Sequence, residues 1–275
     1  MNGQLDLPPV AEHLLLTCTP PLLRLTLNKP ALRNAFDDAL LADLALTFQW
    51  AAAQRGLRAV ILTGAGKAFC AGADFSWMRR MKDYSPEENI ADADRLARCL
   101  HLWDSLPQAT ICAVHGAVLG GGMGLAAAAD IVIAAHGTTF GFPEVRIGLA
   151  PATIAPFVTR RLGAARAREL FVTGRRFDAE QAERWGFVDH VALPDEVQAA
   201  VNSSLEMVLA GGPVALAACK ELIKRVWSGS DPGLMGFTAE MIARLRTGAE
   251  GQEGLRAALA KQRPAWMEDS CSAES

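Results

Sequence analysis

The chain has 275 residues, of which 51% are hydrophobic, and a formal net charge of −3. This composition predicts a globular protein with a large core, and the near-neutral charge with a single tyrosine argues against a nucleic-acid-binding surface. No apolar run approaches the roughly 20 residues that span a bilayer, so we expect no membrane partner.

The cysteine pattern bears on compartment and metal binding. The six cysteines form no C-x-x-C pair and show no metal-ligand spacing. His115 and His136 likewise lack a partner at ligand spacing. We therefore expect free thiols, a cytoplasmic location and no metal site. The cysteines are Cys18, Cys70, Cys99, Cys112, Cys219 and Cys271.

The first 64 residues read as a hairpin, a helix and a strand. Residues 13–27 hold two β-rich runs joined at Pro20-Pro21, which favours a hairpin with a sharp corner. Residues 37–54 carry apolar side chains at helical spacing, with acidic residues at the N-terminal end. RAVILTG, residues 58–64, is typical of a short buried strand.

The alternation of strand and helix continues to about residue 145. Ser85 and the proline and acidic residues after it open a helix over residues 85–105. A strand follows in TICAVHG, and an alanine-rich helix leads into a second strand, DIVIAA. This alternation predicts an α/β fold with mostly parallel strands.

After residue 145 the pattern is almost entirely helical. We expect a helix within residues 174–190, opened by Asp178 and closed at Gly186, and a frayed tail over residues 268–275. The chain then divides into a core over 1–195 with the active site, and a helical region over 196–275 that serves oligomerisation and covers the ligand. Three amphipathic helices are predicted in that region, at residues 215–227, 238–246 and 251–261.

A glycine-rich stretch, VLGGGMGLAAAAD at residues 118–130, marks the start of the alanine-rich helix. It is not a phosphate loop, because Met123 and Leu125 stand where such loops need other residues. Glycines at a helix start leave backbone N–H groups accessible, so the stretch suits a carbonyl oxygen at the positive end of the helix.

Three patches at strand ends complete a possible site: residues 67–78, 114–125 and 140–152. The first two are rich in Gly and Ala, while the third presents Glu144 among apolar neighbours. Desolvation in such surroundings disfavours a charged carboxylate, which suits a general acid or base. Two N–H groups on one carbonyl oxygen, with a carboxylate nearby, would stabilise an enolate.

Taken in order, these patches resemble the enoyl-CoA hydratase/isomerase (crotonase) family. The resemblance covers most of the chain through LNKPALRNAF, AFCAGAD, HGAVLGGGMGLAAAADIVIA, FGFPEVRIGLAPA and LFVTGRRFDAEQAERWGFVDHV. It implies a crotonase-like spiral of ββα turns with a helical C-terminal region, an acyl-CoA thioester substrate that itself carries the coenzyme A, no separate cofactor, and a homotrimer or dimer of trimers.

The family's residue roles can be placed on this sequence. The resemblance implies an oxyanion hole made by the N–H groups of Ala73 and Gly121, with Glu144 as the catalytic carboxylate. It further implies contacts to coenzyme A from Ala71, Ala73 and three residues outside the central motifs, Leu32, Arg33 and Lys261, the lysine in some members reaching a neighbouring subunit.

One departure from the family pattern affects the reaction. Hydratases of the family usually carry a first glutamate two residues after the glycine triplet, where this chain has Gly124. A single carboxylate suits a Δ3,Δ2-enoyl-CoA isomerase, whereas GADFSWMRRM and EVRIGLAPATIAPF resemble the methylglutaconyl-CoA hydratases of leucine degradation, some of which have Gly here. We expect a hydratase. An isomerase and a non-catalytic acyl-CoA-binding protein are the alternatives.

Several polar and apolar residues near the motifs allow more than one role. Asp74 is expected to order its loop rather than act as an acid, and Asp130 to hold a turn. Arg79 and Arg80 are either solvated or paired with a substrate carboxylate. Trp77, like Met78 and Met81, belongs either to the core or to an acyl pocket.

Overall fold

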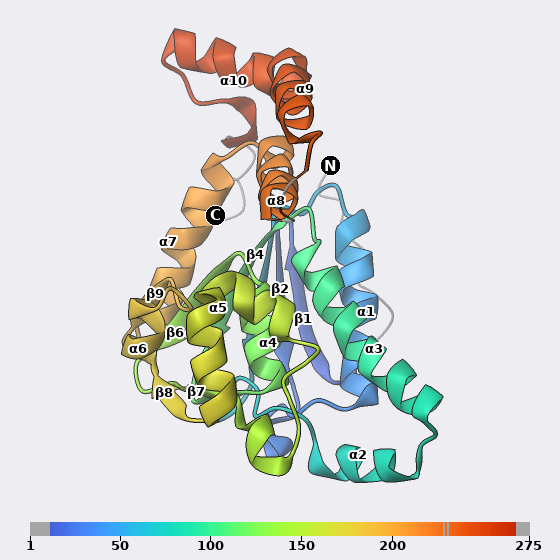
Figure 1. Cartoon of the computed structure of the whole chain (residues 1–275). Coiled ribbons are helices and arrows are strands. Elements are labelled where there is room, and N and C mark those ends of the chain that lie inside the picture. The colour runs from blue at the N-terminus through green and yellow to red at the C-terminus, as the bar shows by residue number, and fades with distance from the viewer. Residues whose placement is uncertain (1–11, 228, 230, 268–275) are drawn as a thin grey trace.

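A computed structural model describes residues 12–267 except 228 and 230. The expected tail over 268–275 lies outside these residues. A six-stranded sheet forms the centre of the molecule (Figure 1). Its strands, in spatial order, are β1 (Leu14–Thr19), β2 (Leu22–Leu27), β3 (Ala59–Gly64), β4 (Ala109–Val114), β6 (Ile131–Ala135) and β9 (His190–Ala192).

A second sheet of three short strands lies beside the first. It consists of β5 (Ala117–Leu119), β7 (Thr139–Gly141) and β8 (Arg176–Asp178). In the larger sheet β1 pairs antiparallel with β2, and all later pairs are parallel. The predicted hairpin and the predicted parallel α/β sheet are therefore confirmed.

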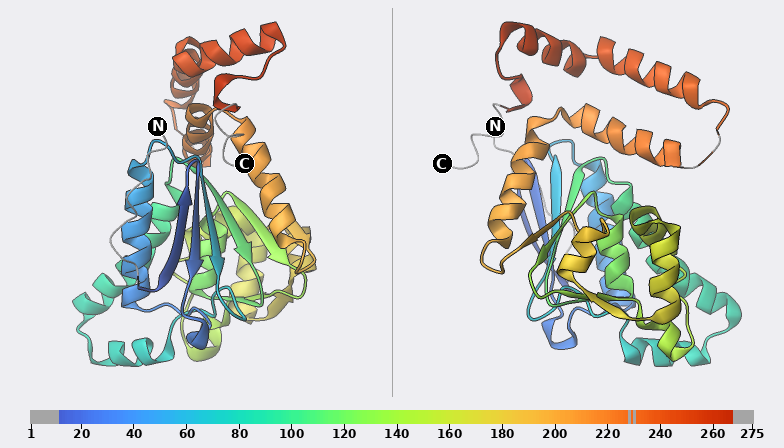
Figure 2. Two further views of the ribbon diagram at one scale, coloured as in Figure 1. Left: turned by 180° about the vertical axis from the view of Figure 1, so that it is seen from behind. Right: turned by 60° about the vertical axis from the view of Figure 1, so that its left-hand side comes forward.

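The helices cover both faces of the larger sheet and extend beyond it (Figures 1 and 2). The short 3-10 helices are η1 (Pro30–Leu32), η2 (Met81–Asp83) and η3 (Pro143–Ile147). The α-helices are α1 (Asp38–Ala53), α2 (Phe75–Arg80), α3 (Pro86–Asp104), α4 (Gly121–Ala128), α5 (Ala155–Thr173), α6 (Ala179–Arg184), α7 (Val197–Ala210), α8 (Pro213–Trp227), α9 (Leu234–Thr247) and α10 (Ala249–Ala260).

Two predicted helix starts carry side-chain caps, of which the cap at Ser85 was expected. Asp37 caps α1 by accepting a hydrogen bond from the N–H of Leu40, 2.9 Å away. Ser85 and Glu88 form a reciprocal capping box at the start of α3. These caps satisfy N–H groups that have no partner within the helix, so the local sequence fixes where each helix begins.

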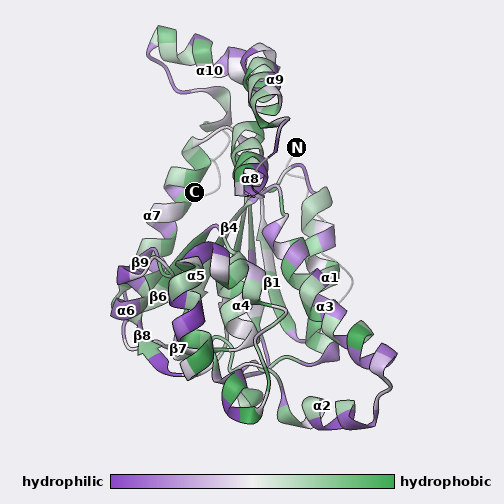
Figure 3. Cartoon of the chain, in the orientation of Figure 1, coloured by the Kyte–Doolittle hydropathy of each residue, from purple (hydrophilic) through white to green (hydrophobic). Residues whose placement is uncertain are grey.

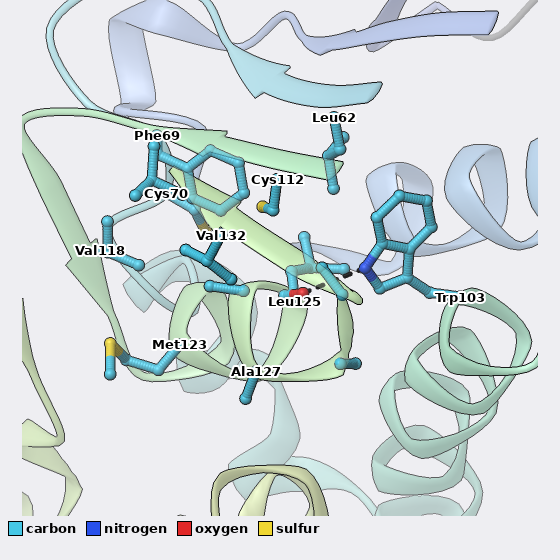
Figure 4. Packing of buried hydrophobic residues seen from close by; sticks show 14 of the residues in the cluster. Leu62, Phe69, Cys70, Trp103, Cys112, Val118, Met123, Leu125, Ala127 and Val132 are labelled. Atoms are coloured by element: carbon cyan, nitrogen blue, oxygen red, sulfur yellow. Dashed lines mark hydrogen bonds between the residues drawn. The ribbon is translucent and has the colours of Figure 1, made fainter. Parts of the chain in front are cut away.

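Helix α4 lies inside the main hydrophobic core (Figure 4). Its residues after Gly121 are all buried, and the indole nitrogen of Trp103 on α3 donates to the carbonyl of Leu125 at 3.1 Å. Trp103 also stacks on Phe48 of α1, with ring centroids 4.9 Å apart. The glycine-rich start of α4 is thus held by a rigid, close-packed surround.

The opposite face of the larger sheet is covered by α7. Val201 of this helix packs against Ile61, Ile111 and Ile133, which project from three neighbouring strands. Helices α9 and α10 lie beyond the sheet, at the end of the molecule opposite α2 and η3 (Figures 1 and 2). Within the described residues no helix is long and apolar enough to cross a membrane.

The prediction of an almost entirely helical chain after residue 145 is wrong in one region. The helix expected within residues 174–190 is α6, which Asp178 caps and after which Gly186 adopts a positive φ as predicted, but the unpredicted strands β8 and β9 lie on either side of it. β8 pairs antiparallel with β7, which places Phe177 on Phe140, ring centroids 5.5 Å apart. A three-residue strand is too short to show a period-two pattern, so tertiary packing decides its conformation.

Candidate active site

Glu144 lies in η3, immediately after β7, the middle strand of the smaller sheet. Pro143 begins this helix, and Gly148 ends it in the left-handed conformation at φ 78°. The guanidinium of Arg146 donates from Nε to the carbonyl of Gly174 at 3.0 Å, which ties η3 to the end of α5. The backbone that carries Glu144 is therefore held from both sides.

The Glu144 side chain is half-buried and points toward the start of α4. A Cβ atom placed on Gly120 would lie 2.9 Å from Glu144 Oε1. Glu144 Oε2 is shielded from solvent and has no hydrogen-bond partner among the described residues. Burial raises the pKa of Glu144, because water no longer stabilises the charged carboxylate. This is the environment of a group that exchanges protons.

The turn into α4 brings a backbone donor beside this carboxylate. Gly120 adopts φ 50° and ψ −119°, a conformation that glycine tolerates and other residues rarely adopt. Its N–H donates to the carbonyl of Gly141 at 3.1 Å, which fixes the turn against β7. The next N–H, that of Gly121, makes no hydrogen bond to any other described residue. It lies at the positive end of the α4 dipole.

The loop before α2 supplies a second such donor. The N–H of Phe36 donates to Gly72 and the N–H of Asp74 donates to Phe36, both at 2.8 Å, so the backbone on either side of Ala73 is fixed. The Ala73 N–H itself has no partner among the residues that the structure describes. A Cβ atom on Gly120 would lie 3.7 Å from Gly72 Cα, so the two loops are in contact.

Two fixed, unpaired N–H groups can bind a carbonyl oxygen, and a half-buried carboxylate beside them can move a proton next to it. Comparison with known proteins agrees with this chemistry. A family model described as enoyl-CoA hydratase/isomerase matches residues 20–269. The chain belongs to the enoyl-CoA hydratase/isomerase family.

Individual relatives support an enzyme of the hydratase type. Mevalonyl-coenzyme A hydratase of Aspergillus fumigatus is 34% identical over 253 residues, which cover 90% of this chain and 92% of the relative. The crystal structure of an enoyl-CoA hydratase from Shewanella pealeana superposes with a TM-score of 0.90 at 34% identity, covering 93% and 96% of the two chains. AtuE of Pseudomonas aeruginosa gives a TM-score of 0.90 at 37% identity, covering 93% and 100%.

The family comparison confirms the predicted crotonase-type α/β fold and identifies the chain as an enoyl-CoA hydratase, a hydro-lyase. The structure brings together most residues expected at the coenzyme A edge. Leu32 is half-exposed in η1, and Arg33 follows it with φ 51°. The N–H of Ala71 donates to the carbonyl of Arg33 at 3.0 Å, so this edge continues into the loop of Ala73.

Lys261 is not part of that group within one chain. It forms the C-cap of α10 in the left-handed conformation, and α10 lies at the end of the molecule opposite η3 and α2 (Figures 1 and 2). The same separation applies to the predicted cover of the ligand by the C-terminal helices, since α9 and α10 do not reach the site in their own chain.

The expected structural roles of two aspartates agree with the contacts. Asp74 caps α2, accepting from the N–H groups of Ser76 at 2.7 Å and Trp77 at 3.0 Å. Asp130 accepts from both the N–H and the hydroxyl of Thr110. Across residues 12–267, apart from the two that the structure omits, no three His, Cys, Asp or Glu side chains form a metal site.

The remaining candidates lie around the loop of Ala73. Arg80 forms an exposed ion pair with Asp38 at 3.2 Å, whereas Arg79 is exposed and forms no ion pair with a described residue. Trp77 belongs to the main core, with 5% of its surface exposed, and Met81 packs against that core. The segment after Glu144 has exposed apolar side chains at Val145, Ile147 and Leu149. The short helix η3, which lies near α2 at one end of the molecule, is coloured largely as hydrophobic in Figure 3.

The sequence did not predict the apolar contacts around the N–H group of Gly121. A Cβ atom on Gly121 would lie 2.7 Å from the ring of Phe36 and 3.8 Å from Leu96 of α3. Phe36 lies in one of the family motifs, but nothing in that motif indicates a contact with Gly121. Leu96 lies in none of the motifs. Their approach to Gly121 follows from helix packing, which periodicity alone does not reveal.

Proposed function

We propose that this enoyl-CoA hydratase adds water across the 2,3 double bond of its substrate with Glu144 as the only acid and base. The observation that supports this most directly is the position of Glu144 Oε1 beside Gly120, next to the unpaired N–H of Gly121. Gly124, where the family's first glutamate would stand, is buried and carries no side chain.

The proposed reaction begins with the thioester oxygen accepting hydrogen bonds from the N–H groups of Ala73 and Gly121. Glu144 takes a proton from water as the water oxygen forms a bond to Cβ. The double-bond electrons move toward the thioester, whose oxygen becomes an enolate in the oxyanion hole. Glu144 then returns the proton to Cα, which yields a 3-hydroxyacyl-CoA with no net gain or loss of protons. Such a hole contributes roughly 3 kcal/mol for each donor.

For the substrate we propose a branched enoyl-CoA, with methylglutaconyl-CoA, an intermediate of leucine degradation, as the leading candidate. The motif resemblance supports this choice, and the mevalonyl-CoA hydratase relative also acts, by its name, on a branched acyl-CoA. Because Arg80 already pairs with Asp38, a contact to a substrate carboxylate is proposed for Arg79.

For coenzyme A and assembly, we propose contacts from Leu32, Arg33, Ala71 and Ala73 of one chain and from Lys261 of a neighbouring chain. A lysine from a neighbouring chain requires an oligomer, and we propose a homotrimer or dimer of trimers in the cytoplasm, with residues 196–275 forming subunit contacts and covering a neighbour's site. Lys261→Ala should raise KM for every acyl-CoA without changing the acyl preference, and mass photometry should give three or six copies.

The isomerase alternative is favoured by one observation, the missing carboxylate at Gly124. Product analysis in heavy-oxygen water separates the two reactions, with crotonyl-CoA, 3-methylglutaconyl-CoA and a 3-enoyl-CoA as substrates. Heavy oxygen at Cβ establishes a hydratase, and the preferred substrate identifies its branch. Double-bond migration without oxygen uptake establishes an isomerase, and binding without turnover establishes a non-catalytic acyl-CoA-binding protein.

A further inference from the structure

Gly124 has no room for a side chain. A Cβ atom placed on it would lie 2.5 Å from Cγ2 and 3.1 Å from Cβ of Ile154, and 3.1 Å from Cδ1 of Leu100. Atoms packed at normal contact distances stay farther apart than the first of these values. The position of the absent glutamate is therefore already filled by apolar atoms.

Ile154 is held in this place by its backbone. It is 1% exposed and stands at the N-cap of α5, where its carbonyl accepts from the N–H groups of Phe157 and Val158, both at 3.1 Å. An isoleucine is branched at Cβ and has few rotamers, so its Cγ2 methyl cannot move away without loss of packing. The contact between Gly124 and Ile154 is thus a property of the fold.

The filled space lies on α4, one turn after Gly121. Side chains on an α-helix lean toward its N-terminus, so the volume above position 124 lies over the turn that contains Gly121. Leu96 and Leu100, one turn apart on α3, follow the same direction, since Leu96 lies near Gly121 and Leu100 near Gly124. A thioester bound at Gly121 therefore lies one turn of α4 away from the apolar atoms of Ile154 and Leu100.

We propose that Gly124 and Ile154 are a matched pair that gives this site an apolar wall beside Cβ and so selects enoyl-CoA thioesters with an additional alkyl group on Cβ. The inference rests on the proposed function, because it requires a thioester oxygen bound at Gly121. A charged or polar side chain in the space above Gly124 would lose its hydration when a substrate methyl group packed against it. The methyl group of Ile154 instead forms a favourable apolar contact with that substrate methyl.

The substrate test compares two acyl groups that differ by one methyl on Cβ, assayed as dehydration of 3-hydroxy-3-methylbutyryl-CoA and 3-hydroxybutyryl-CoA. The wild-type enzyme should prefer the methylated substrate by roughly tenfold or more in kcat/KM. Ile154→Val keeps the Cγ2 methyl group and Ile154→Ala removes it. Ile154→Val should keep the preference and Ile154→Ala should lower it about fourfold, the factor expected for one buried methyl group.

Equal preferences in the two variants would overturn the apolar-wall proposal while leaving hydration by Glu144 intact. Absence of dehydration in the wild-type enzyme would instead contradict the proposed function. A thermal-unfolding cycle tests the matched pair without activity. Gly124→Ala should lower Tm in the wild-type background and lower it much less in the Ile154→Ala background. A Gly124→Ala variant that is as stable as wild type would show that the pair is not matched.

Discussion

Replacing Gly120 by alanine should damage both stability and catalysis, for two separate reasons. The residue adopts φ 50° and ψ −119°, and forcing an L-residue into such a conformation costs about 1–3 kcal/mol. For a chain of this size that cost lowers Tm by about 2–12 °C. The new Cβ would also lie 2.9 Å from Glu144 Oε1, so the carboxylate must shift. A displacement near 1 Å at a reacting group lowers the rate by roughly 100-fold.

Gly137→Ala provides the matched control. Gly137 also has a positive φ, at 80°, but a Cβ placed on it meets no atom of the described chain within 4 Å. We expect this variant to lose stability and to keep the wild-type kcat. Thermal unfolding and steady-state hydration assays on both proteins would test the difference. If Gly120→Ala kept the wild-type kcat at a lowered Tm, the inferred proximity of Glu144 to the turn would be refuted.

Three further predictions concern protonation, a helix cap and a buried amide. Burial raises the pKa of Glu144, and attack by water requires the charged carboxylate of this residue. We therefore expect kcat/KM to fall as the pH drops through a pKa higher than that of an ordinary glutamate. A pH profile with an ordinary carboxyl pKa would contradict this prediction. Asp74→Ala should lower the free energy of unfolding by about 1 kcal/mol and raise KM, because it removes the cap of α2. Asp74→Asn should retain the cap, and chemical denaturation of both variants measures the difference. Asn34→Ala should lower the free energy of unfolding by about 2 kcal/mol or more. Asn34 is fully buried, its Oδ1 accepts from the N–H of Lys29, and its Nδ2 donates to the carbonyl of Ala68. An unchanged denaturation midpoint would show that water replaces those bonds.

Local patterns located several long elements of the fold, although no range was predicted for α5 or α7. Apolar periodicity together with the caps at Asp37 and Ser85 located α1 and α3 to within a residue or two. The short strands β8 and β9 were missed, because their conformation depends on pairing with β7 and β6 rather than on local pattern. Local signals thus predicted what local hydrogen bonds stabilise.

The candidate site divides in the same way. The loops of Ala73 and Gly121 and the carboxylate of Glu144 stand in recognisable motifs, and the structure brings them together. Ile154 also stands in a motif, yet nothing in the sequence shows that its methyl group fills the space above Gly124. The sequence does not predict the location of Lys261 either, because Lys261 ends α10 and the position of α10 depends on tertiary packing of the C-terminal helices.

The most direct test of the account is the Glu144→Gln variant, assayed for heavy-oxygen incorporation at Cβ and, separately, for acyl-CoA binding by calorimetry. The amide keeps the shape of the side chain and removes its ability to take a proton. The account predicts that hydration falls by at least about 100-fold while the Kd for a saturated acyl-CoA changes little. Hydration at the wild-type rate by Glu144→Gln would contradict the assignment of Glu144 as the acid and base.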